Sequence, residues 1–262
     1  MKFGSLFSGI GGIDLGLERA GMTCAWQSEI EPYACQVLKK HWPAIPNVGD
    51  IRGIDWTTVG TVDVVAGGYP CQPFSYAGRR AGADDPRHLW PMFAECLRVV
   101  RPRYALLENV SGHLSLGFGD VQADLAALGY DTQWDCIPAA AVGAPHLRDR
   151  VFVIATRRDG MDSDSSSESN GTFNVAAQSW SSPMANTHQQ GLQGQRRPGV
   201  PKRQTTVRHT RPVCWWQSEP GVGRVANGVP HRVDRLRGLG NAVVPQVAEH
   251  IGRIIMSMEA NT

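Results

Sequence analysis

The chain has almost no excess charge and no long apolar run. In its 262 residues, 26 lysines and arginines face 24 aspartates and glutamates, which leaves a formal net charge of +2. A nucleic-acid surface would therefore have to come from basic residues gathered locally. No apolar run is long enough to cross a membrane. The first residues lead directly into a predicted strand without the layout of a signal peptide. We therefore expect neither a membrane protein nor a strongly basic one.

Cysteine pairing of a recognisable kind is also missing. The chain has six cysteines, but no CxxC pair and no spacing typical of a zinc site. This pattern argues against a disulfide framework and against a structural metal, and favours a reduced, cytosolic protein. Cys24, Cys96 and Cys136 lie in apolar or strand-like surroundings, so we expect them to be packing residues.

What the chain does have is enough apolar material for one large domain, or for one domain with a smaller insert, since 42% of it is hydrophobic. Six strands and five helices are expected. The strands are residues 2–7, 23–28, 62–66, 104–107, 130–137 and 151–156, and the helices are residues 12–20, 32–42, 88–100, 119–128 and a C-terminal segment that follows a turn and ends near Met258. Strands and helices in this arrangement predict an α/β fold.

A glycine-rich turn follows the first predicted strand. It contains Gly9, Gly11 and Gly12, and it opens a helix whose free N–H groups could face a ligand. The turn is not the full dinucleotide pattern, and it lacks the lysine of a phosphate-binding loop. Glu29 follows at the tip of the second strand, where it could accept hydrogen bonds from ribose hydroxyls or simply begin the next helix. Together, turn and acid favour a nucleoside cofactor.

Cys71 lies just past a third buried strand, and a polar, basic loop with Arg79 and Arg80 follows it. Ligands of open α/β sheets bind at such strand ends, and nearby cations would favour the reactive thiolate. The alternative is a small buried cysteine with no chemical role.

Three further side chains are candidates for chemistry. Glu108 ends the next strand on the same sheet edge as Cys71, and burial in a cleft would raise its pKa and let it donate a proton. A carboxylate on the surface is the alternative. Arg148 and Arg150 have the spacing of residues on one face of a strand and could hold an anion there, or else form solvated ion pairs.

These segments, in this order, resemble the cytosine-carbon-5 DNA methyltransferases. The matching pieces are Phe7-Ser-Gly-Ile-Gly-Gly12, Glu29, Gly49-Asp-Ile51, Gly68-Tyr-Pro-Cys-Gln-Pro-Phe-Ser75, Glu108-Asn-Val110, Arg148-Asp-Arg150 and Gly240-Asn-Ala-Val-Val-Pro245. The resemblance implies a Rossmann-like, S-adenosylmethionine-dependent methyltransferase sheet. Residues 1–157 and 230–262 would form the catalytic domain. Residues 158–229, which are irregular and rich in basic residues, amides and tryptophans, would form a small target-recognition region.

The resemblance also implies roles. Cys71 would be the nucleophile and Glu108 the acid at nitrogen 3 of cytosine, while Arg148 and Arg150 would orient the base and its backbone. S-adenosylmethionine would be bordered by Phe7, Gly9, Gly11, Glu29, Ile30, Asp50, Ile51, Pro70, Leu89, Asn241 and Val243. The DNA would be contacted by Gln72, Ser75, Arg79, Arg80, Arg196, Arg197 and Arg203.

The implied partner is double-stranded DNA, methylated by a monomer. The implied location is the cytoplasm, for a bacterial protein or for a phage-encoded protein acting in its host. A cognate restriction endonuclease on another chain is an optional partner. Two alternatives stay open: a tRNA cytosine methyltransferase of the same superfamily, and a catalytically silent DNA-binding protein on the same scaffold. Two departures from the family pattern stand out. His146 occupies a place where the family usually has glutamine, and the target-recognition region is short.

Overall fold

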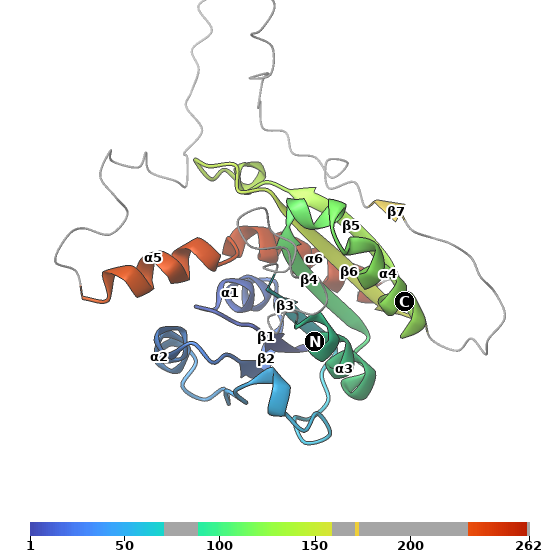
Figure 1. Ribbon diagram of the computed structural model, residues 1–262, viewed down its shortest axis with the longest axis horizontal. Coiled ribbons are helices and arrows are strands. Elements are labelled where there is room, and N and C mark those ends of the chain that lie inside the picture. Colours follow the sequence, from blue (N-terminus) through green and yellow to red (C-terminus); the bar gives the residue numbers. More distant parts are fainter. Residues whose placement is uncertain (71–88, 159–170, 173–229, 261–262) are drawn as a thin grey trace, which may run out of the picture.

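The computed structural model describes residues 1–70, 89–158, 171–172 and 230–260. Their centre is a seven-stranded sheet in the order β2-β1-β3-β4-β6-β5-β7 (Figure 1). The strands are β1 (Lys2–Leu6), β2 (Thr23–Ser28), β3 (Val64–Gly68), β4 (Tyr104–Val110), β5 (Tyr130–Ile137), β6 (Arg150–Arg157) and the two-residue β7 (Gly171–Thr172). The pairs from β2 to β4 are parallel, while β6 runs antiparallel to both of its neighbours.

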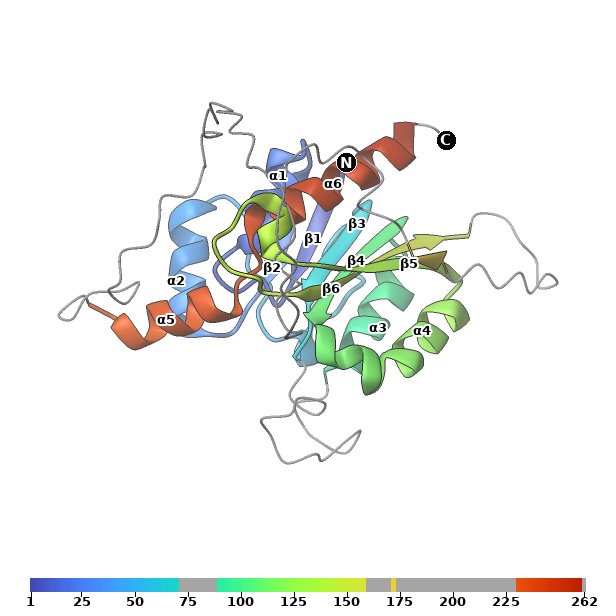
Figure 2. The same cartoon turned by 90° about the horizontal axis from the view of Figure 1, so that it is seen from above.

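Helices cover both faces of the sheet, as the view in Figure 2 shows. They are α1 (Gly12–Arg19), α2 (Pro32–His41), α3 (Trp90–Val100), α4 (Phe118–Ala127), α5 (Arg232–Asn241) and α6 (Pro245–Ala260), with short 3-10 turns η1 (Ile51–Gly53), η3 (Ser111–Ser115) and η4 (Ala139–Val142). Parallel strands need this cover because they are apolar on both faces. The predicted α/β class is therefore confirmed.

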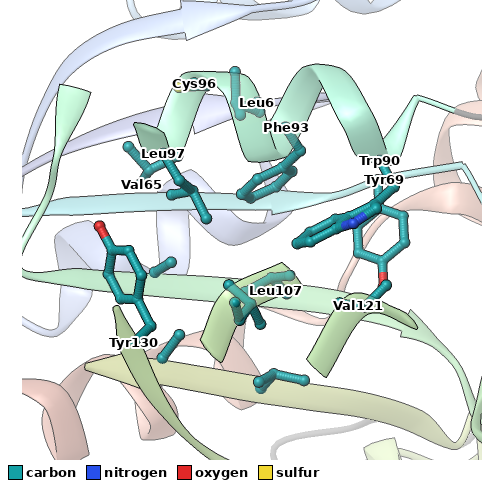
Figure 3. Close-up of a cluster of buried hydrophobic side chains, with 14 of the residues drawn as sticks. Leu6, Val65, Tyr69, Trp90, Phe93, Cys96, Leu97, Leu107, Val121 and Tyr130 are labelled. Carbon is teal, nitrogen blue, oxygen red and sulfur yellow. The ribbon is translucent and has the colours of Figure 1, made fainter. Parts of the chain in front are cut away.

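One apolar cluster joins the sheet to α3 and α4 (Figure 3). Phe93 and Leu97 of α3 and Val121 of α4 point onto Val65 and Leu107 of the central strands, and all five are at most 2% exposed. Cys96 is fully buried in the same cluster, so its predicted packing role is confirmed.

A second cluster joins the opposite face to α1 and α6. The apolar face predicted for the C-terminal helix consists of Val247, Ile251, Ile254 and Ile255. It is present, with Ile254 partly buried and the other three buried. Helices α1 and α6 pack closely because Gly16 has no side chain. A Cβ at this position would lie only 2.4 Å from the Cβ of Ala248. Helix α6 is thereby fixed against the helix that follows the glycine turn.

The segment before α6 differs from the prediction. Residues 232–241, where a turn was expected, form the helix α5. None of its residues is buried, and Val233 and Leu239 are 65% and 43% exposed. Its exposed leucines and two glycines carry no apolar periodicity directed at the core, so the pattern that predicts buried helices could not detect it.

Within the described part of the chain, no helix is both long and apolar enough to span a membrane.

Candidate active site

A cleft of about 440 Å³ opens at the carboxyl ends of β1 to β4, where open parallel sheets bind their ligands. Its wall on the far side is the end of α5 and the segment that joins it to α6. The predicted cofactor residues that line it are Phe7, Gly9, Glu29, Ile30, Asp50, Ile51, Pro70, Leu89, Asn241 and Val243. Residues far apart in the sequence are thus brought together in one cavity of the size that small-molecule sites have.

The glycine turn gives the cleft its floor. Phe7 and Gly9 have positive φ angles of 52° and 56°, so the chain turns sharply after β1. A Cβ on Gly9 would have no neighbour closer than 3.9 Å, which means that this glycine is needed for its backbone conformation rather than for space.

Gly11 differs from its predicted role, because it does not line the cleft. It is the N-cap of α1 with φ 83°, and a Cβ there would lie 2.5 Å from the indole of Trp42. Gly11 instead borders a second hollow of about 510 Å³ behind the turn, together with His146 and Arg148. Gly11 therefore faces the side chain of Trp42 and not the cleft.

Glu29 holds the glycine turn in place. One carboxylate oxygen accepts the N–H of Gly9 at 2.7 Å, and the other accepts the N–H groups of Ile30 and Glu31 at 2.8 Å each. A carboxylate offers about four acceptor sites, so three backbone bonds leave room for a hydroxyl from a ligand. The anchoring function was not predicted, and it is compatible with the predicted ribose contact.

The carboxylate of Asp50 is hydrogen-bonded to Arg52. Both of its oxygens accept hydrogen bonds from the Arg52 guanidinium, and it also accepts the Arg52 N–H at 3.0 Å. These bonds lower the pKa of Asp50. Ile51 is buried beside it and presents an apolar surface to the cleft.

Glu108 is a largely buried acid on the same cleft. Its side chain is 12% exposed, and Oε1 lies 3.0 Å from Nε of Arg150. Burial raises its pKa from 4.5 to about 7, against the opposing effect of Arg150 and Arg148. A Cβ on Gly68, its partner across β3 and β4, would lie 2.4 Å from Oε2, so the carboxylate occupies the space that this glycine leaves. A carboxyl group with this pKa can hold and release a proton near neutral pH.

The two arginines do not share a face as their spacing predicts. Arg150 begins β6 and lines the cleft beside Glu108, whereas Arg148 precedes the strand with φ 44°. Its guanidinium donates to the carbonyl oxygens of Gly240 and Ala242 at 2.6 and 2.7 Å. The strand alternation that predicted a common face does not reach Arg148, because β6 starts two residues later.

Cys71 lies outside the described residues, as do the predicted DNA contacts Gln72, Ser75, Arg79, Arg80, Arg196, Arg197 and Arg203. The described chain leads up to the cysteine through Tyr69 and Pro70. The side-chain amide of Asn109 donates to the carbonyl of Tyr69 at 3.2 Å, and the Tyr69 hydroxyl lies 2.7 Å from Nε2 of His113. Tyr69, which precedes Pro70 and Cys71, is therefore held at the end of β3 by hydrogen bonds to Asn109 of β4 and His113 of η3; these bonds are called the anchor below.

Some residues of the site were missed from sequence. Asp234 and Arg237 of α5 line the cleft, and Tyr69 and His113 form the anchor just described. Tyr69 stands in a quoted motif, but nothing in the sequence marks His113 or the face of α5. His146, whose role was left open, has a buried Nδ1 with no hydrogen-bond partner among the described residues. No group of metal-ligating side chains is found in the part of the chain that the structure covers.

Comparison with known proteins decides the family. The model of the C-5 cytosine-specific DNA methylases matches residues 1–212. The chain belongs to this family. It is 39% identical over 168 residues to the type II methyltransferase M.NgoMIV of Neisseria gonorrhoeae, a match that covers 61% of this chain and 53% of that protein. It is 38% identical over 165 residues to the type II methyltransferase M.Eco47II of Escherichia coli, covering 60% and 40%.

The fold is shared with solved methyltransferase structures. The chain superposes on Spodoptera frugiperda DNMT2 with a TM-score of 0.54 and 23% identity, over 66% of this chain and 55% of that one. The matched part is about half the length of the curated relatives named above.

Proposed function

We propose that this methylase transfers a methyl group from S-adenosylmethionine to carbon 5 of a cytosine in double-stranded DNA. The observation that carries the proposal is Glu108, a largely buried acid whose pKa is raised to about 7, in the same cleft as the glycine turn. An acid on the wall of the cleft that would hold the cofactor is what protonation of a base beside that cofactor requires.

The cleft suits the proposed cofactor. It offers carboxylate oxygens of Glu29 and Asp50 as acceptors for hydroxyl or amino groups, and apolar surface from Ile51, Leu89 and Val243. Gly9 presents no side chain to the cleft, and a Cβ built there would have no neighbour closer than 3.9 Å. When bound, S-adenosylmethionine would supply an electrophilic methyl group on a sulfonium sulfur.

The chain's own residues would prepare the cytosine. The Cys71 thiolate would add to carbon 6 while Glu108 gives its proton to nitrogen 3, which makes carbon 5 nucleophilic. After carbon 5 has taken the methyl group, transfer of the carbon-5 proton to solvent water would expel the Cys71 thiolate. Nitrogen 3 would return its proton to Glu108, which restores both the ring and the acid. Covalent addition divides one difficult step into easier ones. Arg150, 3.0 Å from Glu108, would hold that carboxyl group in position.

The cytosine must leave the duplex to reach this acid, at a cost of a few kcal/mol. In this proposal Gln72, Ser75, Arg79 and Arg80 stabilise the extruded state. Residues 158–229 act as the target-recognition region, with Arg196, Arg197 and Arg203 on phosphates. The site of action would be a bacterial cytoplasm.

Covalent trapping tests the proposal. A duplex with 5-fluorocytosine cannot lose a proton from carbon 5, so wild-type protein with S-adenosylmethionine should stay bound to it through denaturing electrophoresis. Cys71→Ser should bind the same duplex but form no adduct. Wild-type protein that binds DNA and never forms the adduct would favour a silent DNA-binding protein.

A second measurement separates DNA from RNA as substrate. Methyl transfer from labelled cofactor to duplex DNA and to tRNA is compared at equal substrate concentration. Transfer to tRNA alone would contradict the DNA specificity while leaving the chemistry of Cys71 and Glu108 intact.

A further inference from the structure

Arg148 makes a contact that its predicted role does not explain. Nη2 donates to the carbonyl oxygens of Gly240 and Ala242, at 2.6 and 2.7 Å, across more than ninety residues of sequence. The residue also holds a φ of 44°, a backbone conformation that costs a non-glycine residue free energy. Such strain persists only where the surroundings hold it, which points to a defined role for the side chain.

The two acceptor carbonyls lie at the C-terminal end of a helix, where a cation interacts most favourably with the helix dipole. Gly240 is in the last turn of α5 and Ala242 is its C-cap, so both carbonyls belong to the negatively polarised end of a helix. The next residues, Val243 and Val244, connect this end to α6. Asn241, Ala242 and Val243 all line the cleft. Arg148 is therefore hydrogen-bonded to the segment that forms one wall of the cleft, and it lies on the side of the second hollow, not in the cleft itself.

Helix α5 lies at the surface of the described part of the chain, and none of its residues is buried. It packs against α2, where the ring of its N-cap residue His231 lies 5.9 Å from that of Tyr33, and Gly238 closely approaches Ile10. Figure 1 shows α5 extending away from α6 along the side of the molecule. Charge-assisted hydrogen bonds are stronger than neutral ones, so the two bonds from Arg148 are a principal attachment of this wall.

We propose that Arg148 is a positioning residue for the cofactor, which clamps the wall formed by residues 241–243, and that it does not orient the target cytosine. The inference rests on the proposed function, because the wall matters only if a cofactor occupies the cleft. Arg150, two residues further on, pairs with Glu108. The short segment from 148 to 150 would thereby connect the cofactor wall to the catalytic acid.

Arg101 offers a matched control. It also has a positive φ, 51°, and its guanidinium donates to a backbone carbonyl, that of Leu128, at 2.7 Å. It follows α3 and does not line the cleft. Arg101→Met and Arg148→Met thus remove the same kind of bond from the same kind of backbone position, one far from the wall and one behind it.

The test measures equilibrium binding of S-adenosylmethionine and of duplex DNA separately, on full-length protein. Arg148→Met should weaken cofactor binding about tenfold or more, the loss that corresponds to the weak end of hydrogen bonds to charged groups. Its affinity for DNA in the absence of cofactor should stay within about twofold of wild type. Arg148→Lys, which keeps a donor and the charge, should recover part of the cofactor affinity, and Arg101→Met should bind cofactor like wild type.

Other results would overturn the clamp. They are an Arg148→Met variant that binds cofactor like wild type, one that loses DNA affinity alone, and an Arg101→Met variant that loses cofactor affinity equally. If Arg148→Met does not fold, Arg148→Lys decides, since a folded Lys variant with unchanged cofactor affinity but weaker DNA binding contradicts the clamp. Wild-type protein without cofactor affinity would refute the proposed function itself.

Discussion

Replacing Glu108 with glutamine should make the protein more stable at alkaline pH while it abolishes methyl transfer. The glutamine keeps the shape of the side chain and cannot ionise. In the wild type, burial raises the pKa of Glu108 from 4.5 to about 7, so the folded state holds a proton that the unfolded chain releases. Between these two values the folded state binds more protons than the unfolded state, and the free energy of unfolding must fall as pH rises.

The size of the effect follows from the shift. A difference of one pKa unit corresponds to about 1.4 kcal/mol, so ionising Glu108 in the folded protein should cost about 3 kcal/mol by pH 8. The side chain is 12% exposed, so solvent screening reduces this only modestly. Glu108→Gln should therefore match the wild type near pH 4.5 and exceed it progressively up to about pH 7, with a constant difference above that.

Urea denaturation of both proteins at several pH values between 5 and 8 measures this difference. Asp14, another buried acid with its pKa raised by burial to about 6, titrates in both proteins and cancels in the comparison. A difference that does not change with pH would refute the reasoning. A wild type that gains stability over the variant as pH rises would mean that the ion pair with Arg150 outweighs desolvation.

Two further predictions concern a glycine on the cleft and a buried acid near the glycine turn. Gly68→Ala places a Cβ 2.4 Å from Oε2 of Glu108. It should lower adduct formation with 5-fluorocytosine DNA at least about tenfold, with unchanged cofactor affinity measured by equilibrium binding, because a displaced acid misses its proton acceptor. Asp14→Ala removes the acceptor of the Gln27 amide at 2.7 Å and of the Ser5 hydroxyl at 3.0 Å. Leaving those buried donors unpaired should lower the free energy of unfolding by about 1–3 kcal/mol, and an unchanged urea midpoint at pH 5 would contradict the assigned bonds.

Local sequence patterns were sufficient to predict most of the helices and strands, for a physical reason. Buried parallel strands are short apolar runs, and helices such as α6 repeat apolar residues at their own period, so Val247, Ile251 and Ile255 could be assigned to a buried face from sequence. The strand-end positions of Glu29 and Glu108 follow from the same boundaries. Since the carboxyl ends of parallel strands share one sheet edge, their presence on one cleft could be anticipated.

Pattern failed where a residue's position depends on a contact distant in sequence. Helix α5 is exposed and carries no core-facing repeat, so its place is set by contacts distant in sequence, with α2, Ile10 and Arg148 among them. Gly11 and Gly9 are two residues apart in the same turn, yet one packs on Trp42 and the other faces the cleft.

The sequence by itself determined the family and the sheet edge on which the chemistry lies, because motifs and apolar periods are local properties of the chain. Only the tertiary structure decided that Glu108 is largely buried, with its pKa raised to about 7, and that Arg148 donates to the carbonyls of Gly240 and Ala242. Burial and long-range hydrogen bonds are set by residues that are remote in sequence and close in space, and no local pattern encodes them.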